Sequence, residues 1–262
     1  MRIRITIIAL LTLSCHGIFG QELKKEYQKV VSEFIDCVKY GKNEKIANMI
    51  SYPLEREYSI PEIKNKQEFI KRYNDIFDDG LKQMIIKSNL ATDWSDMGWR
   101  GIMLNDGVVW LDFDGHLVAI NYQSNYERNL KSKLIEADKK NIHSSLSDYE
   151  TPVCILETSK YRIRIDDLGK EKFRYACWAI NKSQKYKPDL VLQSGQVILE
   201  GSGGNHSYKF ENAGYTYECS IIETGQENDP PAMLTVYKGD KEILSQSARI
   251  IKNENLSKLY NE

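Results

Sequence analysis

Charge of one sign is the first thing that the sequence lacks, because 36 lysines and arginines stand against 37 acidic residues in a chain of 262. A nearly neutral chain has no basic footprint for nucleic acid or for an anionic membrane surface. Beyond the first twenty residues, no apolar run is long enough to span a bilayer. The composition, 41% hydrophobic and 28% charged, excludes a disordered tail or a membrane bundle.

Metal-binding spacing is also missing. The sequence has no CxxC, and the histidines that follow the leader, His116, His143 and His206, are scattered. Tetrahedral metal sites need ligands at short, regular spacings. We therefore predict no metal site and no cofactor.

Four cysteines remain after the leader: Cys37, Cys154, Cys177 and Cys219. In an exported chain they allow three pairings, which the sequence does not distinguish. Cys177 and Cys219 both stand in strand-like runs, FRYACWAI and YTYECSII, which favours a disulfide between them. The alternative is that all four are small buried apolar side chains, as free cysteine often is.

The first residues predict a secretory signal peptide over residues 1–20. Arg2 and Arg4 precede the short apolar run ITIIALLTL, and small residues follow it. Cleavage after Gly20 is one expectation, and the other is a lipid anchor on Cys15, because TLSC resembles a bacterial lipobox. We expect export to the periplasm or cell envelope, with membrane contact only through such an anchor.

Residues 21–125 change period part-way along. Apolar residues first recur every three or four positions, which predicts a long helix closed by Gly41, a short helix near Ile46, and a third with Asn65 as its cap. This third helix continues after a break at Gly80. Three strand-like runs then follow, WRGIMLNDG, VVWLDFDG and HLVAINYQS, with hairpin turns at 105–107 and 112–115. This order predicts an α+β domain in which a curved, cone-shaped sheet carries helices on its concave side.

The rest of the chain divides into a connector, a β-domain and a tail. Residues 126–150 are charged and could form one helix. Residues 151–252 are nearly all strand signals separated by short turns, which predicts a small antiparallel β-barrel or sandwich. Residues 253–262 look like a frayed tail.

The first domain resembles the nuclear-transport-factor-two-like fold of ketosteroid isomerases and polyketide cyclases, on its element order. The resemblance implies a cavity for a small ligand or for catalysis. The candidate lining residues are Asp93, Asp96, Trp99, Arg100 and Trp110, because catalytic members pair a carboxylate with an apolar floor. Strand alternation would put Trp99 and Arg100 on opposite sheet faces, with the arginine free to bind an acidic ligand or stack on a ring. The alternative is an exposed Asp–Arg pair beside core tryptophans.

The stretch GSGGNH ends the run QVILE and leads into HSYKF. A phosphate-binding loop would need a lysine and a following helix, and neither is present, so the stretch predicts a hairpin turn. A serine–glycine loop with a nearby tyrosine resembles the exported bacterial inhibitors of lysozyme, which are small antiparallel barrels. The resemblance implies partner binding by Ser202, Asn205, His206 and Tyr208.

We conclude from the sequence that the chain is an exported envelope protein with a non-catalytic binding role. The partner is an unidentified protein or small ligand, and nucleic acid is not expected. Two alternatives stay open: an isomerase-like, cyclase-like or hydrolase enzyme in the first domain, and a lysozyme inhibitor in the second.

Overall fold

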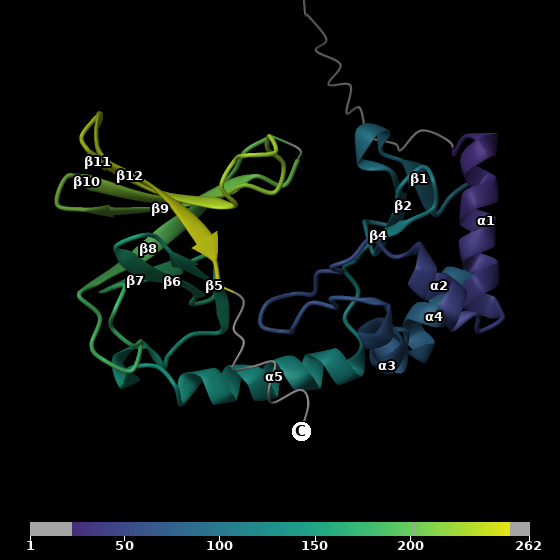
Figure 1. Cartoon of the computed structure of the whole chain (residues 1–262), viewed down its shortest axis with the longest axis horizontal. Helices are drawn as coiled ribbons and strands as arrows, with labels where there is room; N and C mark the ends of the chain where they lie inside the picture. The colour runs from purple at the N-terminus through teal and green to yellow at the C-terminus, as the bar shows by residue number, and fades with distance from the viewer. Residues whose placement is uncertain (1–22, 202, 252–262) are drawn as a thin grey trace, which may run out of the picture.

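Figure 1 shows the chain as a computed structural model that describes residues 23–201 and 203–251. The predicted signal peptide, the lipid-anchor position Cys15 and the tail at 253–262 lie outside these residues. No helix of the described part is long and apolar enough to cross a membrane.

Four helices open the described chain where the apolar period is three to four. They are α1 (Lys25–Lys39), α2 (Asn43–Met49), α3 (Lys66–Ile76) and α4 (Asp79–Lys87). Gly41 follows α1 with a φ of +62°, the left-handed conformation that ends a helix most easily at glycine. The side chain of Asn65 accepts a hydrogen bond from the N–H of Glu68 at 3.0 Å, which confirms the predicted cap of α3.

The break predicted at Gly80 lies before it. Helix α3 ends at Ile76, and the carboxylate of Asp78 caps α4 by accepting from the N–H of Leu81 at 3.0 Å. Gly80 is inside the first turn of α4, where a Cβ would lie 2.5 Å from Tyr122 Oη. Glycine is therefore needed there for close packing and not for the break.

A four-stranded antiparallel sheet follows the helices. Its strands, in spatial as well as chain order, are β1 (Trp94–Asp96), β2 (Ile102–Leu104), β3 (Val109–Leu111) and β4 (Leu117–Ile120). The turns predicted at 105–107 and 112–115 connect β2 to β3 and β3 to β4. Buried side chains of the sheet and the four helices form one apolar core within residues 23–120.

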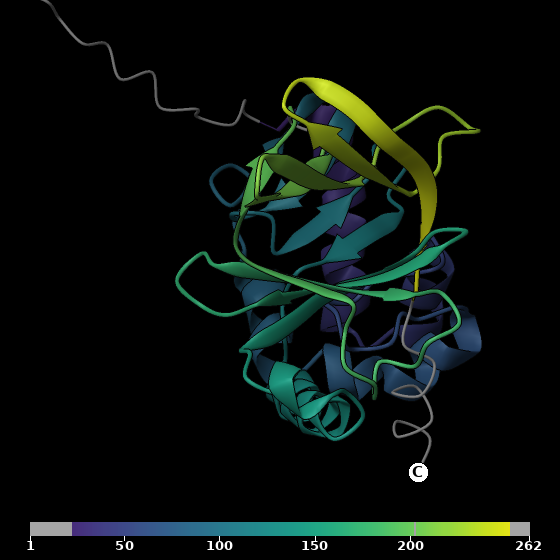
Figure 2. The same ribbon diagram turned by 90° about the vertical axis from the view of Figure 1, so that its left-hand side faces the viewer.

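Residues 151–250 form a closed eight-stranded antiparallel barrel, which decides between the barrel and the sandwich. Around the barrel the strands follow the order β10-β11-β12-β5-β6-β7-β8-β9. Their bounds are β5 (Thr151–Glu157), β6 (Tyr161–Asp167), β7 (Phe173–Ala179), β8 (Leu190–Leu199), β9 (His206–Asn212), β10 (Tyr215–Ile221), β11 (Ala232–Lys238) and β12 (Lys241–Ile250). A second apolar core lies in the barrel. Figure 2 looks onto the barrel, with the helices α1 to α4 behind it.

Strand β8 joins two runs that the sequence separates by a turn at SG. Its first half pairs with β7 and its second half with β9. Between the halves, Ser194 has a φ of +61°, and a Cβ on Gly195 would lie 2.0 Å from the ring of Phe210. The predicted turn is therefore a bend inside one strand, and such bends allow a sheet to close into a barrel.

The charged connector forms helix α5 (Asn125–Lys139), which runs along the bottom of Figure 1 from near α3 to beneath the barrel. Its buried acids, Glu127 and Asp138, are eleven residues apart, which is about three helical turns, so they lie on one face. Glu127 Oε1 accepts from Arg56 Nε at 2.8 Å, and both side chains are almost fully buried. The segment 55–57 looks like solvated charge in the sequence, and that interpretation is wrong for Arg56.

At the other end of α5, Asp138 enters a buried charge network on the barrel. Its Oδ2 lies 2.6 Å from Arg164 Nη2 and accepts from the Tyr149 hydroxyl at 2.7 Å. Asp166 bridges Arg164 and Arg174 at 2.7 Å each. A small apolar cluster around Tyr149 surrounds the network. A short 3₁₀ turn, η2 (Ser144–Leu146), connects the helix to this region. Helix α5 thus joins the two parts of the chain through one buried acid at each end.

Candidate functional site

Two loops meet at one end of the barrel, which we call the barrel tip: residues 200–201 and 203–205 between β8 and β9, and residues 222–231 between β10 and β11. The strand register brings them together, because His206 is opposite both Leu199 and Ile221, and Ile221 is opposite Ala232. In Figure 1 they leave the barrel on the side of the sheet-and-helix part.

Asn205 fastens one loop to the other. Its Oδ1 accepts from the N–H groups of Glu223 and Thr224 at 2.9 and 2.8 Å, and its Nδ2 donates to the Thr224 carbonyl at 2.9 Å. The loops are so close that a Cβ on Gly203 would lie 2.4 Å from Thr224 Oγ1. Gly204 has a φ of +91°, so a second glycine serves the backbone conformation. Asn205 therefore links the two loops through side-chain hydrogen bonds.

The surface of the tip is apolar and acidic. Leu199 is 78% exposed at the end of β8, and the exposed side chains of Val197 and Ile198 precede it. Four exposed acids follow in the two loops: Glu200, Glu223, Glu227 and Asp229. The segments 199–206 and 222–231 contain no lysine or arginine. Such a surface suits a partner that is basic and offers an apolar contact.

No family model, curated protein or solved structure matches this chain. The tip has three consecutive exposed apolar side chains at the end of β8, Leu199 the most exposed, and these lead into loops that carry acidic residues and no lysine or arginine.

The partner-binding residues predicted in GSGGNH have different places. Ser202 lies outside the described residues. The Asn205 side chain is hydrogen-bonded to the other loop. His206 Nδ1 lies 2.8 Å from the Gly204 carbonyl oxygen. Tyr208 is buried in the barrel core, with its ring 5.0 Å from that of Phe173, because alternation along β9 turns it inward. The expectation that Tyr208 faces a partner is wrong.

The acids predicted to line a cavity in the first domain shape local turns instead. Asp93 accepts hydrogen bonds from the N–H of Asn89 and the hydroxyl of Thr92, both at 2.8 Å. The hydrogen bond from the Asn89 N–H is the main cause of the lowered pKa of Asp93. Asp96 accepts from the N–H of Gly98 at 2.9 Å and lies 3.7 Å from Lys24 Nζ.

The aromatic and basic members of that prediction are exposed or half-buried. Trp99 and Arg100 belong to a 3₁₀ turn, η1 (Gly98–Arg100), so the expected strand alternation does not apply to them. Trp99 is 68% exposed. The Arg100 guanidinium lies 5.9 Å from the centre of the Trp110 ring, which is the stacked arrangement considered from the sequence.

All four described cysteines are buried free thiols. The predicted bridge between Cys177 and Cys219 is therefore not formed in the structure. Cys177 is on β7 and Cys219 on β10, and β8 and β9 lie between these strands in the barrel. Both thiols belong to the apolar core, and burial raises the pKa of each. This agrees with the alternative that they act as small buried side chains.

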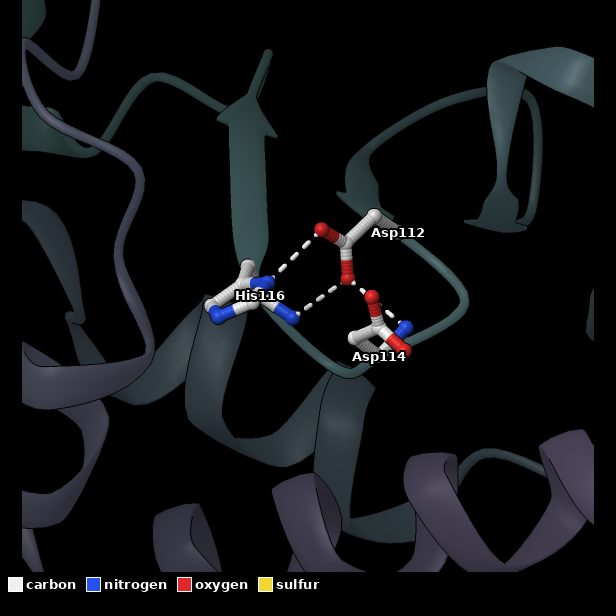
Figure 3. A group of neighbouring side chains, drawn as sticks. All are labelled: Asp112, Asp114 and His116. Carbon is white, nitrogen blue, oxygen red and sulfur yellow. Dashed lines mark hydrogen bonds and ion pairs between the residues drawn. The ribbon is translucent and has the colours of Figure 1, made fainter.

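One group of possible metal ligands was not predicted from the sequence. Asp112, Asp114 and His116 share the turn between β3 and β4, and one ligand atom from each lies within 4.8 Å of the others (Figure 3). Asp112 Oδ1 accepts from the N–H groups of Asp114 and His116, and Oδ2 lies 2.7 Å from His116 Nδ1. The spacing DFDGH was the available signal. The hydrogen bonds that Asp112 makes to Asp114 and His116 are those of a side chain that caps a turn.

Proposed function

We propose that the chain is an exported protein of a bacterial cell envelope that binds a basic protein partner, without catalysis, through the barrel tip. The observation that carries the proposal is Leu199, which is 78% exposed beside four exposed acids on loops that Asn205 fastens together. Export rests on the leader at 1–20.

The chemistry of the tip supports a protein partner. An apolar side chain at the centre of a contact supplies affinity when it enters a pocket, and charges around it steer association and select the partner. Leu199 has the first role here. Glu200, Glu223, Glu227 and Asp229 have the second, and they select against acidic surfaces.

The hydrogen bonds of Asn205 add a second support. A loop that is already ordered loses little conformational freedom when it binds, so more of the contact energy appears as affinity. A plain hairpin turn has no need for a side chain that makes four hydrogen bonds to a neighbouring loop.

We infer that the four helices and the sheet that follows them form a nuclear-transport-factor-two-like domain. We infer a domain boundary between α5 and β5. Neither inference is needed for binding at the tip.

The experiment is affinity capture from the envelope of the producing organism with three immobilised proteins: wild type, Leu199→Ser and Ile243→Ser. Ile243 is the matched control, because it is 49% exposed near the hairpin at the opposite end of the barrel. We expect wild type and Ile243→Ser to retain a basic protein that salt elutes, and Leu199→Ser to lose it. Purified c-type lysozyme, the partner of the inhibitors that the sequence resembles, is a first probe. Equal retention by all three would contradict the proposal.

A further inference from the structure

Strand β8 changes neighbours at its bend, and after the bend it has only one. Before the bend, β8 pairs with β7 as far as Gly195, which lies opposite Phe173. After the bend, residues 196–199 pair with β9 alone. Strand β7 begins at Phe173, so within the described residues no strand continues beside this part of β8. Residues 196–199 therefore form a free sheet edge, which we call the β8 edge.

The hydrogen bonds between β8 and β9 show which backbone groups face the β8 edge. The Glu200 N–H donates to the Asn205 carbonyl at 2.8 Å, so Glu200 faces β9. Hydrogen-bonded and non-hydrogen-bonded positions alternate in an antiparallel pair, which turns Ile198 toward β9 and Val197 and Leu199 away from it. The N–H and C=O groups of Val197 and Leu199 thus point to the side where the described chain has no second strand.

The exposure of the side chains agrees with a free edge. Along a barrel strand, inward and outward side chains alternate, so exposure should alternate as well. Val197 and Ile198 are adjacent, yet each is 38% exposed, and Leu199 is 78% exposed. An exposed apolar edge is a template for another strand, and proteins usually protect such edges with charge or proline. Residues 196–199 contain neither.

A second free edge, on β12, has a different chemistry. The Ile251 N–H donates to the Ile155 carbonyl, so alternation turns Ser245 to the same side, where β5 no longer pairs with β12. This edge presents polar serine, and Lys241 and Glu242 stand at its start, which is the charged protection that the β8 edge lacks. The apolar β8 edge is the better template.

We propose that the basic partner binds by strand addition, with an extended segment that pairs with Val197 and Leu199 along the β8 edge. The inference rests on the function proposed above and adds the binding mode. Backbone hydrogen bonds at the edge supply affinity, as in other complexes formed by strand addition. The acids of the barrel tip, with Glu200 directly after β8, select a segment that carries lysine or arginine. They also oppose a second copy of this chain, because two tips would bring like charges together.

The test is fluorescence anisotropy of the full chain with a labelled octapeptide of alternating valine and lysine. Val197→Pro removes the outward N–H and leaves the hydrogen bonds to β9 intact, because proline is tolerated where a strand N–H faces solvent. We expect this variant to bind the peptide about tenfold more weakly than wild type, as the loss of a backbone hydrogen bond implies. Val197→Thr keeps the N–H and should bind as wild type does.

Two further controls separate strand addition from other causes. Ser245→Pro makes the same change on the β12 edge, which β9, β10 and β11 separate from β8, and it should bind as wild type does. A peptide with all of its backbone amides N-methylated cannot donate to a sheet edge and should not bind wild type. This second control needs no protein variant, so it decides the question even where Val197→Pro does not fold. A valine–glutamate peptide should not bind.

Strand addition is overturned if wild type does not bind the valine–lysine peptide or binds the N-methylated one equally well. It is also overturned if folded Val197→Pro binds as wild type does, or if Ser245→Pro weakens binding as much. The function proposed above fails separately. Weak binding by Leu199→Ser with full binding by Val197→Pro would keep the barrel tip as the site and discard strand addition, whereas full binding by both would discard both.

Discussion

At the scale of single residues, the buried ion pair between Arg56 and Glu127 shows how far charge can be from solvent. Arg56 stands in the run EREY, which has no apolar period of its own, and Glu127 is 71 residues further along. Glutamate and arginine are rarely buried unless they are paired. The pairing is set by the fold and not by local sequence, so Arg56 looks like a solvated charge in the sequence.

The first prediction concerns this pair. Arg56→Ala leaves the Glu127 carboxylate buried without its partner, so we expect the free energy of unfolding to fall by about 3–5 kcal/mol. Urea denaturation monitored by circular dichroism measures it. Lys45→Ala, which breaks an exposed pair with Glu33, is the control and should lower the free energy of unfolding far less, because water screens that pair. Similar small losses in both variants would mean that the buried pair contributes little.

The turn at Asp112 gives a pH-dependent prediction. Burial opposes ionisation, but hydrogen bonds from the N–H and imidazole of His116 outweigh it and lower the pKa of Asp112 below its ordinary value of 3.8. For an acid with a depressed folded pKa, the stabilisation is present above the unfolded pKa and is lost as pH falls through the folded pKa. Asp112→Asn should therefore lower Tm at pH 7 and match wild type near pH 2. An equal difference at both pH values would show that the carboxylate charge is not the cause.

At the scale of elements, local sequence patterns predict the features that depend only on neighbouring residues. The apolar periods of α1 to α4, the cap at Asn65 and the turns of the small sheet were all readable, because each depends on neighbours in the chain. The bend in β8 was not, because Gly195 is needed only where Phe210 approaches it from β9. Only part of the barrel tip could be predicted from the sequence. The glycines of GSGGNH predict a loop there. Its contact with the second loop was not predictable, because Asn205 bonds Thr224, which is nineteen residues further along the chain.

Helix α5 gives a prediction about where the barrel begins. A fragment of residues 151–262, cut near the boundary that the sequence suggests, lacks Asp138 and Tyr149, which meet Arg164. We expect it to melt less cooperatively and at a lower temperature than residues 124–262, which keep both. Thermal unfolding followed by circular dichroism compares them. If both fragments melt alike, α5 is not part of the barrel's stable unit.

At the scale of the whole molecule, the described chain carries two large apolar cores, one in the sheet-and-helix part and one in the barrel. Helix α5 connects these two parts through buried ion pairs at Arg56 and Arg164. The apolar and acidic barrel tip belongs to the second part.

The most direct measurement of the central claim is photo-cross-linking from position 199 in the producing organism. A photoreactive phenylalanine analogue replaces Leu199 in one strain and Ile243 in another, and cross-linked products are identified by mass spectrometry. We expect one prominent product with a basic protein from position 199, which is absent from position 243 and lost when Glu223 and Glu227 are changed to glutamine. No product at 199, or the same products at both positions, would contradict it.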